Sequence, residues 1–203
     1  MQYEKYQKSR DLAWQILINH KVCRLPVKVS MICRSMGYAI TSYAKSRELI
    51  EKLDLSERTD SSDGFTCNGV IFYNEQCTVP RQRFTVAHEL GHILLHNGSG
   101  IYNREPSAND KPIEQEANVF ASRLLAPACV LWGLGVTNTG QISEICDISM
   151  QSATFRMKRL QELYDREKDF MQRKGESCFL MSPLEKAVYE QFRNYIETTQ
   201  LIL

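Results

Sequence analysis

The sequence lacks the features of several classes of protein. No apolar run in its 203 residues approaches the roughly 18 residues that a membrane-spanning helix needs, and the charged residues 1–10 resemble no signal peptide. The formal net charge is only +1, which argues against a partner as strongly charged as nucleic acid or an anionic membrane surface. We therefore expect a compact cytoplasmic protein that contacts no membrane, and we do not expect direct nucleic-acid binding.

Cysteine is present, but not in a pattern that binds metals. The seven cysteines never occur as Cys-x-x-Cys, the spacing found in many zinc-thiolate sites. In a cytosolic protein such cysteines are reduced and act as small buried hydrophobic residues. No zinc-thiolate site is expected.

The stretch that carries chemistry is residues 83–96, which read RFTVAHELGHILLH. Residues four apart on a helix share one side with about 6 Å of rise, so His88 and His92 can present their imidazoles to one ion. Glu89 lies about 100° round from His88, where a carboxylate can act as general base for a metal-bound water. Apolar residues on nearly every face predict a buried helix, in which a zinc ion would give the two histidines the partner that burial requires.

Two histidines leave a zinc ion one protein ligand short. His96 lies about 12 Å further along the helix than His88, which is too far for both to bind an ion at about 2.0 Å. The metalloprotease pattern that continues with Gly and then His is also absent, because Leu95 and Gly98 occupy those positions. The third ligand should therefore be an acid on a later helix.

That later helix is predicted at residues 112–126, between Pro112, which suits a first helical turn, and Pro127, which cannot continue the helix. Glu116 stands at one edge of its core face and Glu114 at the opposite edge. The carboxylate of Glu116 can reach a neighbouring helix, and the alternative for either acid is to stay solvated in the first turn and complement the helix dipole.

These residues resemble the ImmA/IrrE family of bacterial and phage zinc metallopeptidases. The resemblance is carried by residues 83–92, by the EAN motif at 116–118 with the following Phe120 and Ala121, and by the LLAP motif at 124–127. It spans roughly residues 60–130.

The resemblance implies a site, a fold and a substrate. It implies one Zn²⁺ ion held by His88, His92 and Glu116, with Glu89 as the catalytic base, in a zincin-like core of the gluzincin type. It also implies limited cleavage of a helix-turn-helix transcriptional repressor in a bacterial, prophage or mobile-element switch. Such a repressor is the expected partner.

The remaining elements predict an α+β protein, mostly helical, with a small antiparallel sheet. A strand at residues 70–73 is expected to border the active site and to hold an extended substrate by main-chain hydrogen bonds. The loop at 97–111 is expected to gate the cleft. The predicted parts are an N-terminal helical segment at 1–58, a zinc peptidase core at 59–132, a helix-turn-helix-like helical subdomain at 133–173, and a strand-like segment with a helix at 174–203.

Residues 141–163 resemble a helix-turn-helix, with Ser149 as N-cap of the second helix. An accessory helical subdomain is favoured over DNA binding, because a recognition helix would expose Met150 and Phe155 and because acids interleave with the bases that follow. The alternative function is a non-hydrolytic, metal-bound regulator or antitoxin-like partner that binds DNA or protein through residues 139–165. A module that only binds would not need Glu89.

Overall fold

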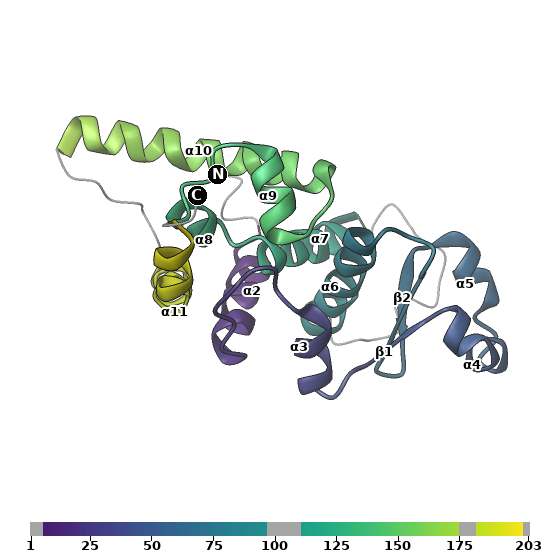
Figure 1. The fold of residues 1–203 in the computed structure, drawn as a ribbon. Helices are drawn as coiled ribbons and strands as arrows, with labels where there is room; N and C mark the ends of the chain where they lie inside the picture. Colours follow the sequence, from purple (N-terminus) through teal and green to yellow (C-terminus); the bar gives the residue numbers. More distant parts are fainter. Residues whose placement is uncertain (1–5, 97–110, 175–181, 201–203) are drawn as a thin grey trace. The chain divides into compact units, whose positions relative to one another are not determined.

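A computed structural model of the chain describes residues 6–96, 111–174 and 182–200 (Figure 1). The chain forms two compact units, the first from the described parts of residues 1–10 and 28–121, the second from those of 11–27 and 122–203. The predicted gating loop lies outside the described residues except for Lys111. The predicted division at residues 58, 132 and 173 stays a prediction.

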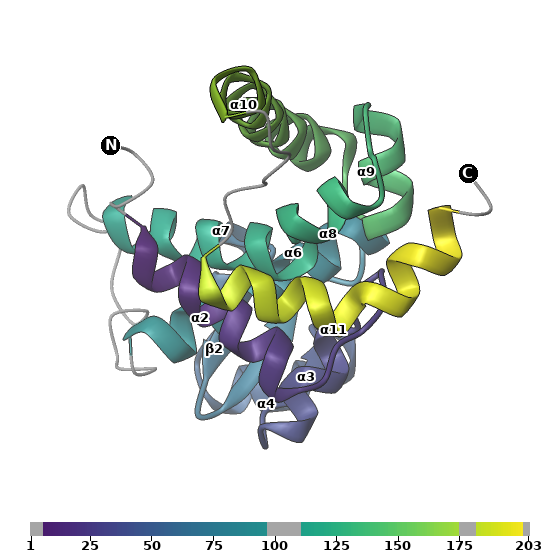
Figure 2. The ribbon, with the colours of Figure 1, turned by 90° about the vertical axis from the view of Figure 1, so that its left-hand side faces the viewer.

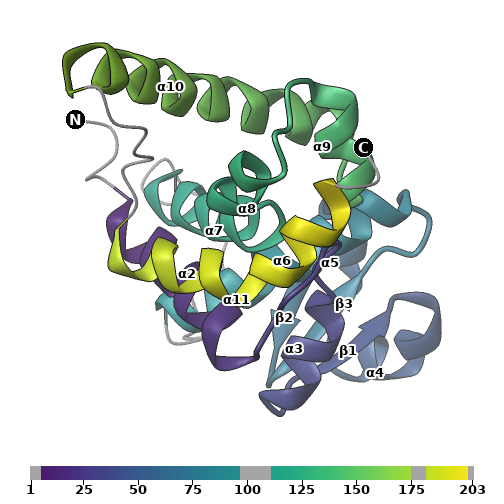
Figure 3. The ribbon, with the colours of Figure 1, turned by 60° about the vertical axis from the view of Figure 1, so that its left-hand side comes forward.

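The first unit contains a small sheet of three strands, β1 (Ala39–Ser42), β2 (Gly64–Cys67) and β3 (Val70–Tyr73). Their order is β1-β3-β2, with β1 parallel and β2 antiparallel to β3 (Figure 3). The sheet is therefore mixed, and the prediction of an antiparallel sheet is wrong for β1. The reason is the connection: a tight turn joins β2 to β3, whereas the chain from β1 returns through helices, as parallel pairing requires.

The position of β3 corrects a second prediction. β3 is the central strand, so both of its edges are already paired, one with β1 and the other with β2. It cannot add a substrate strand, and the expectation that residues 70–73 hold the substrate is wrong. Among the described residues β2 is an edge strand of the sheet.

Strand alternation gives the sheet two different faces. Phe65 of β2 and Phe72 of β3 are paired neighbours on one face, where they form a buried cluster with Ile50. Thr66 follows Phe65 and therefore belongs to the opposite face, which lies against helix α6 (Val79–His96). The other helical elements that lie wholly within the first unit are α3 (Val29–Ser35), η1 (Ala44–Ser46), α4 (Arg47–Lys52) and α5 (Ser56–Ser61).

Two helices contribute to both units. They are α2 (Gln7–Asn19) and α7 (Lys111–Leu125), and each crosses from one unit to the other along its length. The predicted helices at residues 83–96 and 112–126 correspond to the second half of α6 and to α7. The part of α7 up to Ala121 belongs to the first unit, together with all of α6.

The second unit is helical among its described residues. Its elements are part of α2, the end of α7, and the helices α8 (Ala128–Gly133), α9 (Thr139–Cys146), α10 (Met150–Lys174) and α11 (Pro183–Gln200). Helix α11 runs beside α2 (Figure 2), and Gln191 Nε2 donates hydrogen bonds of 2.8 Å to the Leu17 carbonyl and 2.6 Å to the Val22 carbonyl. Helices α8 and α11 also pack together.

The helix-turn-helix-like element is formed by α9 and α10. Asn138 and Gln141 make a capping box at the start of α9. The Ser152 N–H donates to Ser149 Oγ at 3.2 Å, which confirms the predicted N-cap of α10. Met150 and Phe155 on α10 are 57% and 71% exposed, so the expectation that these side chains would be buried is wrong.

None of the described helices combines the length and the apolar character that crossing a bilayer would take. The six cysteines within the described ranges are free. The expected burial holds for Cys33, Cys129 and Cys146 but is wrong for Cys23, which is exposed.

Candidate metal centre

Helix α6 is buried by its neighbours over much of its second half. Its buried residues include Glu89, Leu90, Gly91 and His92. A Cβ atom at Gly91 would lie 2.9 Å from Phe120 Cδ1 and 3.3 Å from the Ala117 Cα atom. Glycine is needed here because α7 passes close to α6. The close packing of the two helices offsets the cost of about 1 kcal/mol that a glycine carries within a helix.

The close approach of α7 brings three side chains together. His88 Nε2 and His92 Nε2 lie 2.8 Å apart, and each lies 3.2 Å from a carboxylate oxygen of Glu114. One ligand atom from each of the three residues falls within 4.8 Å of the others. This His-His-Glu group could hold one metal ion.

The donor atoms fit such an ion. Two imidazole nitrogens whose lone pairs face each other at hydrogen-bond distance repel unless a proton or a cation lies between them. The nearby carboxylate adds a negative charge to the same point, which favours a cation. Two nitrogens and one oxygen are also the ligand set of many catalytic zinc sites, which keep a fourth position open.

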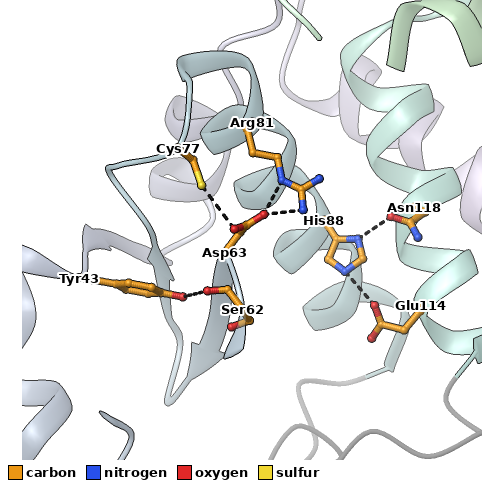
Figure 4. A network of polar contacts seen from close by, with 8 residues as sticks. All are labelled: Tyr43, Ser62, Asp63, Cys77, Arg81, His88, Glu114 and Asn118. Carbon is orange, nitrogen blue, oxygen red and sulfur yellow. Dashed lines mark hydrogen bonds and ion pairs between the residues drawn. The ribbon is translucent and has the colours of Figure 1, made fainter. Parts of the chain in front are cut away.

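Asn118 determines how His88 faces this point. The His88 Nδ1–H donates to Asn118 Oδ1 at 3.0 Å (Figure 4). With its proton on Nδ1, the ring keeps the lone pair of Nε2 for a metal. Sequence reasoning did not single out Asn118 for this role, although its position four residues after Glu114 places both side chains on one face of α7.

Glu116 does not lie with His88 and His92 in the structure, contrary to the prediction. Its carboxylate is 3.5 Å from His96 Nε2 instead. Residues two apart on a helix point about 200° from each other, so α7 can turn only one of Glu114 and Glu116 towards a given point. Burial lowers the pKa of His96 below its ordinary value, although the Glu116 carboxylate acts in the opposite direction.

The electrostatics of Glu114 suit a metal ligand. The close contacts of His88 and His92 with its oxygens lower the pKa of the Glu114 carboxyl far below its ordinary value, so the carboxyl is ionised at neutral pH. Its side chain is 51% exposed, whereas His92 is almost fully buried. The His-His-Glu group is therefore accessible to solvent from the side of Glu114.

Glu89 has a different partner. It is 7% exposed, and its Oε2 accepts a hydrogen bond of 2.9 Å from Thr66 Oγ1 in strand β2. It does not belong to the three-residue group described above. Sequence reasoning missed Thr66, since nothing in the motif indicates which strand residue will meet the helix.

The buried HELGH helix and the convergent His-His-Glu group are features of a metallopeptidase. Comparison with known families agrees: residues 45–132 match the IrrE N-terminal-like domain (Peptidase_M78). The match agrees with the resemblance of these residues to the ImmA/IrrE metallopeptidase family. The matched stretch contains every residue of the candidate metal centre. No curated protein matches the chain.

Proposed function

We propose that the protein is a zinc-dependent metalloendopeptidase. The observation that carries the proposal is the convergence of His88, His92 and Glu114 beside the buried Glu89, within a domain of a metallopeptidase family. In this proposal these three residues bind the ion and Glu89 is the general base. A zinc ion held there supplies Lewis-acid chemistry, lowering the pKa of a bound water and polarising the scissile carbonyl.

The residues of the chain divide the remaining work. Glu89 accepts the proton of the attacking water and returns it to the leaving amine, because a buried carboxylate beside the ligands can do both. Asn118 holds the His88 ring in the required tautomer through their 3.0 Å hydrogen bond. The core is zincin-like in this reading, of the type that uses a glutamate as third ligand.

Glu114 replaces Glu116 as the proposed third ligand. The support is geometric, because the Glu114 oxygens lie 3.2 Å from both histidine nitrogens while Glu116 lies beside His96. The position of Asn118, one turn after Glu114, supports the same register of α7.

For the substrate we propose a helix-turn-helix repressor, cleaved at one or a few sites in the cytoplasm. The support is the family match of residues 45–132 and the edge position of β2. An extended segment could add to that edge by main-chain hydrogen bonds, which carry little sequence information. Limited cleavage would then depend on which segment of the repressor can open, and a flexible segment meets this requirement better than a packed core.

The experiment uses purified protein loaded with one equivalent of zinc, incubated with the helix-turn-helix repressor encoded nearest to its gene. We expect one or a few discrete fragments on a gel, identified by mass spectrometry, and none after chelation with 1,10-phenanthroline. The control is Glu89→Gln, which should keep stoichiometric zinc and the fold but lose hydrolysis. Cleavage that survives both treatments would overturn the proposal, and many-site digestion of unrelated unfolded proteins would replace it with a general peptidase.

A further inference from the structure

The segment at residues 63–66 runs alongside α6 and contacts it at three successive turns. Arg81 Nε donates to Asp63 Oδ2 at 2.6 Å (Figure 4). A Cβ atom at Gly64 would overlap Thr85 Cγ2 and lie 2.9 Å from the Phe72 carbonyl oxygen. Thr66 Oγ1 donates to Glu89 Oε2 at 2.9 Å.

The spacing of these contacts explains why they coexist. Arg81, Thr85 and Glu89 are four residues apart, so they share one side of α6 with about 6 Å between turns. Gly64 and Thr66 are two residues apart on a strand, so their side-chain positions share one face and are separated by about 6.6 Å. The spacing between turns of the helix and the spacing between Gly64 and Thr66 are nearly equal, so each of these two strand residues lies beside one turn of α6.

From this register we infer that Thr66 is a positioning residue for Glu89. This inference rests on the proposed function, in which Glu89 is the base. The Thr66 hydroxyl holds Oε2, which fixes the carboxylate rotamer and leaves Oε1 to accept the proton of the water. Proton transfer requires hydrogen-bond reach and alignment, so a carboxylate that rotates freely would transfer protons less often.

Gly64 determines how closely the strand that carries Thr66 approaches α6. Because no side chain stands between Gly64 and Thr85, the strand backbone can come close enough to α6 for the short threonine hydroxyl to reach Glu89. The ion pair of Asp63 with Arg81 holds the start of the strand against the same side of the helix.

The test compares Thr66→Val, which keeps the shape of the side chain and removes the hydroxyl, with Thr66→Ser, which keeps the hydroxyl. The matched control is Thr41→Val on β1, which also removes a strand hydroxyl with a hydrogen-bond partner, in this case Ser46 Oγ at 3.0 Å. Zinc content is measured for each variant, and kcat and KM are measured on one fluorescence-quenched decapeptide that the wild type cleaves. The side-chain carboxyl ¹³C resonance of Glu89, assigned with Glu89→Gln, is recorded for each variant as well.

We expect Thr66→Val to keep one zinc and to lower kcat by about tenfold or more, with KM changed less than about twofold. The Glu89 resonance should move in Thr66→Val and stay in place in Thr66→Ser and Thr41→Val. An unmoved resonance together with unchanged kcat in Thr66→Val would overturn the positioning role. If the zinc-loaded wild type cleaves no peptide and no repressor, the proposed function fails by itself, while the resonance still decides whether Thr66 holds Glu89.

Discussion

Asn118 Oδ1 accepts a hydrogen bond of 3.0 Å from His88 Nδ1, across the contact between α7 and α6. The bond orients an imidazole that also approaches Glu114, one turn earlier on α7. A single face of α7 therefore provides both an acidic group for the metal centre and the partner that sets the tautomer of one of its histidines. Substitutions on this face of α7 should therefore change metal binding.

Replacing Asn118 by Leu should weaken zinc binding without removing it. The His88 ring would lose the acceptor that keeps its proton on Nδ1, and losses of such partners cost about 10- to 100-fold in metal affinity. Competition with a chromophoric chelator measures the change. Asn118→Asp should bind zinc at least as tightly as the wild type, since it restores an acceptor. Equal affinity in the leucine variant would show that the hydrogen bond has no influence on the metal.

Glu114→Ala should lose stoichiometric zinc and hydrolysis together, whereas Glu116→Ala should keep both nearly intact. The reason is placement, because Glu114 faces His88 and His92 and Glu116 faces His96. Metal analysis after dialysis against excess zinc, together with the repressor cleavage assay, measures both properties. His92→Ala serves as the control for metal loss. The reverse result would return the ligand to Glu116 and change the rotation of α7.

Asp63→Asn should destabilise the protein at neutral pH but much less in acid. The hydrogen bond from Arg81 lowers the pKa of Asp63 below its ordinary value of 3.8. A carboxyl group whose pKa is lower in the folded state contributes stability above its unfolded-state pKa and loses it as the pH falls through the folded-state pKa. Urea unfolding of wild type and variant at pH 7 and at about pH 3 measures the difference, which should shrink in acid. A constant difference would exclude an electrostatic contribution.

Alkylation should distinguish the cysteines by burial. Burial raises the pKa of Cys33 and of Cys129 to about 12, so almost no reactive thiolate exists at pH 8. Cys23 is exposed and should react first. Peptide mapping after brief treatment of the native protein with iodoacetamide measures each site, with urea-unfolded protein as the control. Rapid modification of Cys129 in the native state would show that its surroundings open.

Local patterns allowed the sequence to predict the helix that carries the site. The pairing of His88 with His92 depends only on helical spacing, and the structure brings their Nε2 atoms to 2.8 Å. Residues 70–73 were predicted as a strand from their own composition, and they form β3. In both cases the information lies within one element.

The errors all concern relations between elements. Whether Glu114 or Glu116 faces α6 depends on the rotation of α7 about its own axis, which packing at Gly91 and Phe120 determines. The central position of β3 depends on where β1 adds to the sheet, and β1 precedes it by some thirty residues of chain. The contact of Thr66 with Glu89 likewise joins residues 23 apart in sequence, and no local pattern reports it.

The turn between β2 and β3 has a consequence for how the chain tolerates change in length. Asn68 and Gly69 both have positive φ, at 49° and 75°, so two residues suffice to reverse the chain. Because side chains alternate along a strand, inserting or deleting one residue between Thr66 and this turn would send the threonine to the other face of the sheet. Phe65 would then be forced towards Glu89 and the helix. Homologous chains that keep the same chemistry should therefore vary in length on either side of this hairpin and not within it.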